Sequence, residues 1–381
     1  SLVRRNQFNK KAKKDYFGAS PNVFIGRFGY PNINVGFLSN EVLSKDVDSP
    51  KTWSKNNYSI QNVIDLRSEL INSRFKTNIK TFDQKLLEIT REVSQAEEAV
   101  DVEVNLNKKP NFSLNFDNEV TPYGPSVELK KAKITENTKI KKSVDKVVTD
   151  TDLRATEGLS YLYKKGYDEK FLTKLLSVGN LGVNKDRKLV PTRWSITATD
   201  DTLGKNLITE IKKYNEYDYK AFFGGYQGNY YLILFFPELW SYELFETYVG
   251  DMTNHNNLNP EFGTDYESYN GRKYYANNTA GGYYAARLPI LEYLKKVKRQ
   301  SSVIALRFVT SDYYVGLGVW VVRQATRHAL LNNPITFSSK ELMLTYAKKL
   351  VKKKFGKNLD YFLNQSQLLK LGHQKPLSKF F

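Results

Sequence analysis

The sequence predicts an α+β protein of two closely packed units, each mixing helices and sheet. Its 381 residues suffice for two domains, and 40% hydrophobic with 14% aromatic residues exclude a mainly disordered chain. Helical and alternating apolar patterns are interspersed along its length. Between residues 250 and 282 the hydrophobic periodicity is lost and Asn, Gly and Tyr are frequent. This is typical of a seam, a boundary between two structural units. We therefore expect units at 18–258 and 259–372, with a basic arm before them and a flexible tail after them.

The first unit is expected to begin with strands. Residues 17–36 alternate aromatics with Gly and Pro, which favours short strands joined by tight turns. Apolar residues at helical spacing predict amphipathic helices over 59–75 and 81–99. The alternating stretches "VDVEVNL" and "NFSLNF" predict a strand pair, and the charged residues 130–150 an exposed connection.

The rest of the chain is expected to alternate helix and strand. Capped apolar patterns predict helices in "DTDLRATEGLSYLYKKG" and "DEKFLTKLLSVGNLG". Residues 192–211 are expected to run from a strand into a helix, and "KAFFGGYQGNYYLILFFP" to form a hairpin turning near Gly228. Beyond the seam we expect a helix ("GGYYAARLPILEYLKKVKRQ"), a strand ("SVIALRFV"), a helix ("GVWVVRQATRHALL") and a basic helix around 338–355.

The charge of the chain indicates a polyanionic partner. The formal net charge is +18, and a surface this positive repels itself unless an anion neutralises it. The basic residues cluster in the arm 1–17 (Arg4, Arg5, Lys10, Lys11, Lys13, Lys14) and at 130–146, 295–299 and 348–357. Clustering favours nucleic acid, although a solvated Lys-rich surface is the alternative.

Several site classes are excluded by composition. There is no cysteine, so disulfides, thiolate metal sites and cysteine nucleophiles are absent from this sequence. With only three histidines (His255, His328, His373), a multi-histidine metal site is not expected, and no cofactor is evident. No apolar run reaches the length of a membrane helix, and no secretory signal is visible at the start. We expect a cytoplasmic protein with no membrane partner.

The last eight residues, "QKPLSKFF", have the pattern of a docking peptide. On one helical turn Leu377, Phe380 and Phe381 share a face, and Gln374 adds an amide at its edge. Packing of these aromatics back onto their own domain is the alternative. The spacing resembles the motif Q-x-x-(aliphatic)-x-x-(aromatic)-(aromatic), by which replication and repair proteins bind the sliding clamp PCNA. The tail 374–381 is therefore expected to bind that clamp.

Four long segments together resemble the archaeal Nre family of DNA repair proteins. They are "FGASPNVFIGRFGYPNINVG" (17–36), "TRWSITATDDTLG" (192–204), "AGGYYAARLPILEYLKKVKRQ" (280–300) and "GVWVVRQATRH" (318–328). The resemblance implies Nre N-terminal and C-terminal domains, a clamp-binding tail and a place on the archaeal nucleoid. The family commonly carries a four-cysteine, probable zinc element before the first segment. This sequence has none, so zinc binding is not carried over.

Within these segments, arginines beside aromatics are the candidate nucleic-acid contacts. Arg27 lies between glycines, with Phe28 and Tyr30 as stacking surfaces, although turns and core packing explain the same residues. Arg193 and Trp194 open the segment that ends at two carboxylates. The remaining candidates are Tyr283, Tyr284, Arg287, Arg323 and Arg327. The tyrosines could equally be packing residues, and the arginines could pair with acids on neighbouring elements.

Asp200 and Asp201 support the competing, enzymatic interpretation. Adjacent carboxylates at the end of a strand could hold Mg²⁺ for phosphoryl chemistry. The alternative is that one of them caps a helix beginning near Thr202. We therefore expect a DNA repair factor that binds DNA through its basic surface and is recruited by PCNA. A metal-dependent nuclease or nucleotide-processing enzyme acting at clamp-bound DNA is the alternative.

Overall fold

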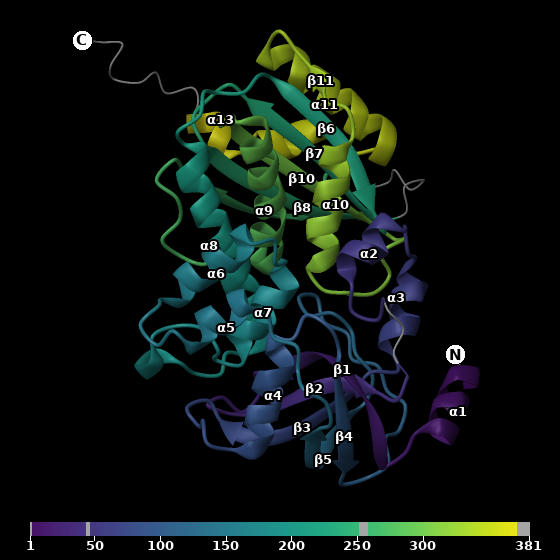
Figure 1. The fold of residues 1–381 in the computed structure, drawn as a ribbon. Helices are drawn as coiled ribbons and strands as arrows, with labels where there is room; N and C mark the ends of the chain where they lie inside the picture. Colours follow the sequence, from purple (N-terminus) through teal and green to yellow (C-terminus); the bar gives the residue numbers. More distant parts are fainter. Residues whose placement is uncertain (1, 43–45, 251–257, 372–381) are drawn as a thin grey trace. The chain divides into compact units, whose positions relative to one another are not determined.

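A computed structural model describes residues 2–42, 46–250 and 258–371 of the chain (Figure 1). These residues fall into two compact units, one on each side of the division between Leu203 and Gly204. Both units combine helices with a sheet, so the prediction of an α+β protein is confirmed. The expected tail motif at 374–381 lies outside the described residues. No helix among those described has the length and apolarity to cross a bilayer.

Unit 1 is built around a closed five-stranded barrel. Its strands follow the order β1-β2-β3-β5-β4, and β4 pairs back onto β1. All pairs are antiparallel except β3 with β5, which run parallel. The strands are β1 (Asp15–Ile25), β2 (Asn32–Asn40), β3 (Ile71–Asn78), β4 (Val100–Leu106) and β5 (Ser126–Ile134). One helix, α4 (Lys85–Gln95), connects β3 to β4.

Alternation along the strands fills the barrel. In β2, Ile33, Val35 and Phe37 are buried in one core together with Val102 and Val104 of β4. Helix α4 adds its apolar stripe to the same core, because its residues repeat at helical spacing. The side chains between the inward positions therefore form the outer surface of the barrel.

The other helices of unit 1 precede, interrupt or follow the barrel. They are α1 (Leu2–Lys11), α2 (Pro50–Lys55), α3 (Ile60–Arg67), α5 (Lys142–Thr149), α6 (Ala155–Lys164), α7 (Glu169–Ser177) and a short 3-10 turn, Asn184–Asp186. The basic arm predicted at 1–17 is thus helix α1 followed by the start of β1. Helix α8 (Thr192–Ile211) begins in unit 1 and continues into unit 2.

Unit 2 is a six-stranded mixed sheet with helices on both faces. The strand order is β11-β6-β7-β10-β8-β9, and β10 runs parallel to β8. The strands are β6 (Lys220–Tyr226), β7 (Asn229–Phe236), β8 (Ser241–Gly250), β9 (Phe262–Glu267), β10 (Ser302–Thr310) and β11 (Ile335–Thr336). The helices are α9 (Ala280–Val297), α10 (Trp320–Leu331), α11 (Lys340–Phe355), α12 (Leu359–Leu363) and α13 (Gln367–Leu371).

Alternation along β7 shows how the two helix layers are held. Leu232, Leu234 and Phe236 share a core with α11, α12 and α13. Phe235 points the other way and contacts Tyr293 of α9, with ring centroids 5.8 Å apart. Strands buried on both faces read as near-continuous apolar runs, which explains the sequence "NYYLILFF".

Several predicted elements are confirmed, among them the β6–β7 hairpin and the helices and strand beyond the seam. The strand expected at the start of 192–211 is wrong, because α8 is helical throughout. Its β-branched Ile196, Thr197 and Thr199 suggested a strand, but β-branching costs a helix only tenths of a kcal/mol per residue, roughly 0.5. The apolar spacing of Leu203 and Leu207, both buried, is helical.

Three other expectations in unit 1 are wrong. The helix predicted over 59–75 ends at Arg67, and β3 begins at Ile71. Residues 111–116 lie in the β4–β5 connection and form only an isolated bridge, Asn115 with Tyr123, among the described residues. The exposed connection expected over 130–150 contains the end of β5 and helix α5.

Candidate nucleic-acid interface

A hollow of about 500 Å³ lies on the outer surface of the barrel in unit 1. The β1–β2 loop (26–31) contributes Gly26, Arg27 and Phe28 to its lining, and β2 and β3 contribute Asn34 and Arg74. The β4–β5 connection (107–125) contributes Leu114, Asn115, Phe116, Asp117, Val120, Thr121 and Tyr123, and α8 contributes Arg193. We call this the barrel hollow.

The floor of the barrel hollow is the outer face of β2 and β3. Because Phe75 points into the core, its neighbours Arg74 and Lys76 point outward. Arg74 is opposite Gly36 and Lys76 is opposite Asn34 in the β2–β3 register. Gly36 has no side chain, so nothing from β2 covers Arg74 directly. Two cations therefore stand in a row on a polar sheet face.

Of the three arginines that line the barrel hollow, one is paired with acidic side chains and two are available to a ligand. Arg193 donates to Glu119 at 2.7 Å and lies 3.5 Å from Asp117, so its charge is matched locally. Arg27 and Arg74 make no ion pair with any residue that the structure describes. Each of these two guanidinium groups can bind a phosphate by donating two parallel N–H hydrogen bonds to its oxygens.

Exposed rings border these cations. Phe28 is 78% exposed and Phe116 is 41% exposed, although both are large apolar side chains. The Arg27 guanidinium lies 4.9 Å from the centre of the Phe28 ring. Exposed rings beside cations are the combination on which unstacked bases and their phosphates bind.

A second aromatic pair lies beside the loop. Tyr30 and Trp194 are both about half exposed, and their ring centroids are 5.3 Å apart. Tyr123 is half-buried in the barrel hollow. Burial raises the pKa of Tyr123 above its ordinary value, and the positive charge of Arg74 works in the opposite direction. Tyr123 therefore stays a neutral phenol that can donate a hydrogen bond near Arg74.

The sequence candidates Arg27, Tyr30, Arg193 and Trp194 are thus brought together in unit 1. Arg74, Lys76 and Phe116 were missed in the sequence. The signal for Arg74 and Lys76 is the alternation in "INSRFKTN", which is a strand pattern with a basic outer face. No local sequence pattern identifies Phe116, because only the path of the long β4–β5 connection brings it into the barrel hollow.

The candidates of unit 2 lie elsewhere, and most of them are buried. Tyr283 and Arg287 are essentially inaccessible, and Tyr284 is only slightly exposed. Arg287 donates to Glu267 at 2.6 Å, and Trp240 donates to the same carboxylate at 3.2 Å. Burial raises the pKa of Tyr283 well above its ordinary value, and the Glu267 carboxylate adds to that rise. These residues hold α9 onto the sheet.

The two arginines of α10 are engaged as well. Arg327 donates to both oxygens of Glu292 on α9, at 3.1 and 2.9 Å. Arg323 is buried, with 8% of its surface exposed. The sequence had offered pairing with a neighbouring element as the alternative to phosphate contact, and the geometry of Arg327 agrees with that alternative.

Asp200 and Asp201 lie in the middle of α8, so neither interpretation of them fits the structure. They are not at the end of a strand, and the helix begins well before them, at Thr192. Asp200 is buried. Among the described residues no group of three acidic or histidine side chains is placed to hold a metal ion. The clamp-motif residues Gln374, Leu377, Phe380 and Phe381 lie outside the described residues.

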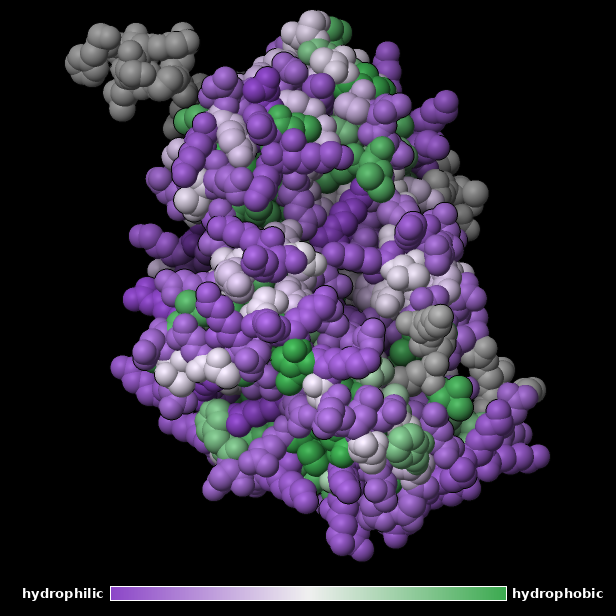
Figure 2. Space-filling view, in the orientation of Figure 1, coloured by the Kyte–Doolittle hydropathy of each residue, from purple (hydrophilic) through white to green (hydrophobic). Residues whose placement is uncertain are grey.

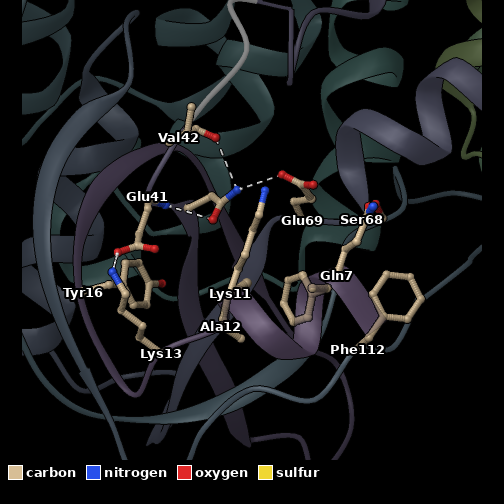
Figure 3. A pocket seen from close by; sticks show the side chains of 13 residues that line it. Gln7, Lys11, Ala12, Lys13, Tyr16, Glu41, Val42, Ser68, Glu69 and Phe112 are labelled. Atoms are coloured by element: carbon tan, nitrogen blue, oxygen red, sulfur yellow. Dashed lines mark hydrogen bonds and ion pairs between the residues drawn. The ribbon is translucent and has the colours of Figure 1, made fainter. Parts of the chain in front are cut away.

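A smaller hollow of about 160 Å³ lies between α1 and the barrel (Figure 3). The carboxylate of Glu41 accepts from Lys13 at 2.8 Å, and Glu69 accepts from Asn40 at 3.3 Å. Its two acidic side chains balance its two lysines, Lys11 and Lys13, whereas the barrel hollow has three arginines against Asp117. The exposed face of unit 1 seen in Figure 2 is mainly hydrophilic, with hydrophobic side chains in small separate groups. The barrel hollow is thus the better candidate for a polyanion.

Comparison with known proteins gives matches along nearly the whole chain. The family model "Archaeal Nre, N-terminal" matches residues 2–253, and "Archaeal Nre, C-terminal" matches residues 267–380. The chain is 36% identical to "DNA repair protein NreB" of Archaeoglobus fulgidus over 97% of its own length and 92% of that protein. It is also 36% identical to "DNA repair protein NreA" of Haloferax volcanii, over 85% and 80% of the two chains. No solved structure matches it.

Proposed function

Since this chain belongs to the archaeal Nre family, we propose that it is a DNA repair protein that binds DNA directly and is recruited to it by the sliding clamp PCNA. The observation that carries the repair role is the likeness to proteins named for DNA repair, over at least 80% of both chains in each match. Likeness of this extent includes the segments that build the barrel hollow, since the match begins at residue 2.

Charge supports the direct DNA contact. The net charge of +18 favours a polyanion, and Arg27 and Arg74 stand in the barrel hollow without an ion pair to any described residue. Cations that neutralise phosphates release counterions, so the affinity falls steeply as salt rises. DNA binding by this surface is therefore expected to be weak and salt-sensitive on its own.

The tail is proposed to compensate for that weakness. Gln374, Leu377, Phe380 and Phe381 match the clamp motif, and burial of the three apolar side chains contributes on the order of 5–9 kcal/mol before ordering costs. A clamp that encircles DNA holds the body at a high effective concentration beside the duplex. Weak phosphate contacts then suffice, and the protein is expected on the nucleoid in the cytoplasm.

The proposal is tested by binding the protein to PCNA and to DNA separately and together. Deletion of residues 374–381 is expected to abolish clamp binding, as is Phe380→Ala with Phe381→Ala. Both variants should keep the thermal midpoint and the affinity for free DNA. Lys375→Ala with Lys379→Ala is the matched control, because on a helical turn these positions would fall opposite those of Leu377, Phe380 and Phe381.

Two outcomes would contradict the proposal. Clamp affinity that survives loss of both phenylalanines removes the recruitment step. Absence of DNA binding even at low salt removes the direct contact and leaves an adaptor that touches only proteins.

A further inference from the structure

The barrel of unit 1 has the topology of a known oligonucleotide-binding architecture. Five strands close in the order β1-β2-β3-β5-β4, with β3 and β5 parallel and helix α4 between β3 and β4. A five-stranded Greek-key barrel of this kind is the OB-fold. Its ligands lie across the second and third strands, between the loop that joins strands one and two and the loop that joins strands four and five.

The barrel hollow occupies that position. Its floor is the β2–β3 face with Arg74, one wall is the β1–β2 loop with Arg27 and Phe28, and the other wall is the β4–β5 connection with Phe116. The topology and the hollow are independent observations, because strand order says nothing about where exposed rings and unpaired cations gather. Their coincidence locates a ligand site.

The rings decide which form of nucleic acid fits. A base can lie on Phe28 or Phe116 only if its own face is free, and in a duplex the faces of the bases are covered by their neighbours. Arg27 and Arg74 can contact the phosphates of a strand whose bases are turned onto these rings. Binding of this kind does not require side chains that recognise base edges in the groove of a duplex.

We propose that the barrel hollow is a binding site for single-stranded DNA, with Arg27 and Arg74 on phosphates and with Phe28 and Phe116 stacking on bases. This assignment deepens the proposed function and rests on it, because it names the form of DNA that the repair protein binds. Tyr30 of the β1–β2 loop and Trp194 of α8 extend the aromatic surface, and a further base can stack on them. Arg193 is a positioning residue that holds the β4–β5 connection to α8 through Glu119.

Fluorescence anisotropy of the full chain with labelled oligo(dT) of about 16 nucleotides, the upper site size of one such barrel, tests the assignment. A duplex and an oligo(rU) of the same length are run beside it. Phe28→Ala is expected to weaken oligo(dT) binding roughly 5- to 150-fold, the loss that follows one base–aromatic stack. Arg27→Ala with Arg74→Ala should lower the slope of log affinity against log salt by about 0.7 for each phosphate contact.

The chain offers matched controls. Phe17, which is 57% exposed on β1, does not line the barrel hollow, so Phe17→Ala should bind as the unaltered protein does. Lys131→Ala with Lys133→Ala removes two exposed charges from β5 and should leave more of the salt slope intact than the arginine pair. Thermal midpoints of all variants should stay close to that of the unaltered protein, because the replaced side chains are exposed or half-exposed.

The outcomes separate this inference from the proposed function. If the protein binds DNA but Phe28→Ala and the arginine pair bind as the controls do, the site assignment is wrong while the repair function stands. Tighter binding of the duplex, or of oligo(rU), overturns the assignment to single-stranded DNA. If no DNA of any form binds at low salt, the direct DNA contact of the proposed function fails as well.

Discussion

Tyr30 and Trp194 lie with their ring centroids 5.3 Å apart and their planes inclined at 54°, although one belongs to the β1–β2 loop and the other to the first turn of α8. Both rings remain about half exposed. The contact joins two segments that are distant in the sequence, 17–36 and 192–204, at the edge of the barrel hollow. The bases of a nucleic acid can stack on an exposed aromatic pair of this kind.

The close approach of the β3 backbone to β2 leaves no room for a side chain at Gly36. A Cβ built there would lie 2.1 Å from the Ser73 carbonyl oxygen and 2.9 Å from the Arg74 Cα atom. Gly36→Ala is therefore expected to lower the free energy of unfolding by about 1–3 kcal/mol, the usual cost of overpacking. Urea denaturation followed by circular dichroism measures this. Gly26→Ala, whose nearest neighbour would be 3.2 Å away, is the milder control, and equal stability of the two variants would contradict the geometry.

The buried pair Arg287–Glu267 makes a stability prediction for unit 2. Arg287→Met leaves the Glu267 carboxylate buried without its cation, so it should cost about 3–5 kcal/mol of unfolding free energy. Adding Glu267→Gln removes the stranded charge and keeps an acceptor for Trp240, so the double variant should recover most of the loss. Denaturant titration of Arg287→Met, Glu267→Gln and the double variant, beside the unaltered protein, measures the coupling. The double variant should bind DNA as the unaltered protein does, and weaker binding by it would return Arg287 to the list of DNA contacts.

Lys174 on α7 predicts a pH dependence of stability. Burial lowers the pKa of Lys174 to about 7, the Lys170 charge lowers it further, and the carboxylates of Asp48, Asp168 and Glu97 partly oppose this. Between about pH 7 and the ordinary value of 10.5 the unfolded chain holds a proton that the folded chain lacks. The folded state should therefore gain stability as the pH rises through this window, and lose it as the pH falls towards 7.

The measurement is the unfolding free energy of the unaltered protein and of Lys174→Met between pH 6 and 9.5. The difference between the two should change steadily across the window, with the unaltered protein gaining relative to the variant as the pH rises. A difference that is independent of pH would show that the Lys174 ammonium keeps its proton in the folded state. Subtracting the variant removes the contribution of every other titrating group.

Much of the fold could be predicted from the sequence, because its patterns are local. An apolar run around Gly228 predicts the hairpin of β6 and β7. Four apolar positions at helical spacing predict α4. The boundary between α3 and β3 could not be predicted. Arg67, at the end of α3, is buried and forms an ion pair with Asp48, whereas its residue type suggests an exposed position. Such a partner, distant in the sequence, is invisible to periodicity.

The site shows the same division. Arg27, Tyr30, Arg193 and Trp194 could be proposed from arginines next to aromatics, and the fold brings them to one place. Arg74 and Phe116 could not, because one needs the β2–β3 register and the other needs the path of the long β4–β5 connection. Arg287 and Arg323 looked equally good in the sequence, which cannot show that their side chains are covered.

The most direct test of the central claim uses Trp194 as a reporter of the barrel hollow. The chain has four tryptophans, and Trp53, Trp240 and Trp320 are almost fully buried whereas Trp194 is 46% exposed. Titration with oligo(dT) is predicted to quench the intrinsic fluorescence in step with binding, and Trp194→Phe is predicted to abolish the quenching while binding measured by anisotropy persists. Binding of oligo(dT) with unchanged fluorescence, or quenching that survives in Trp194→Phe, would place the DNA elsewhere and contradict the account.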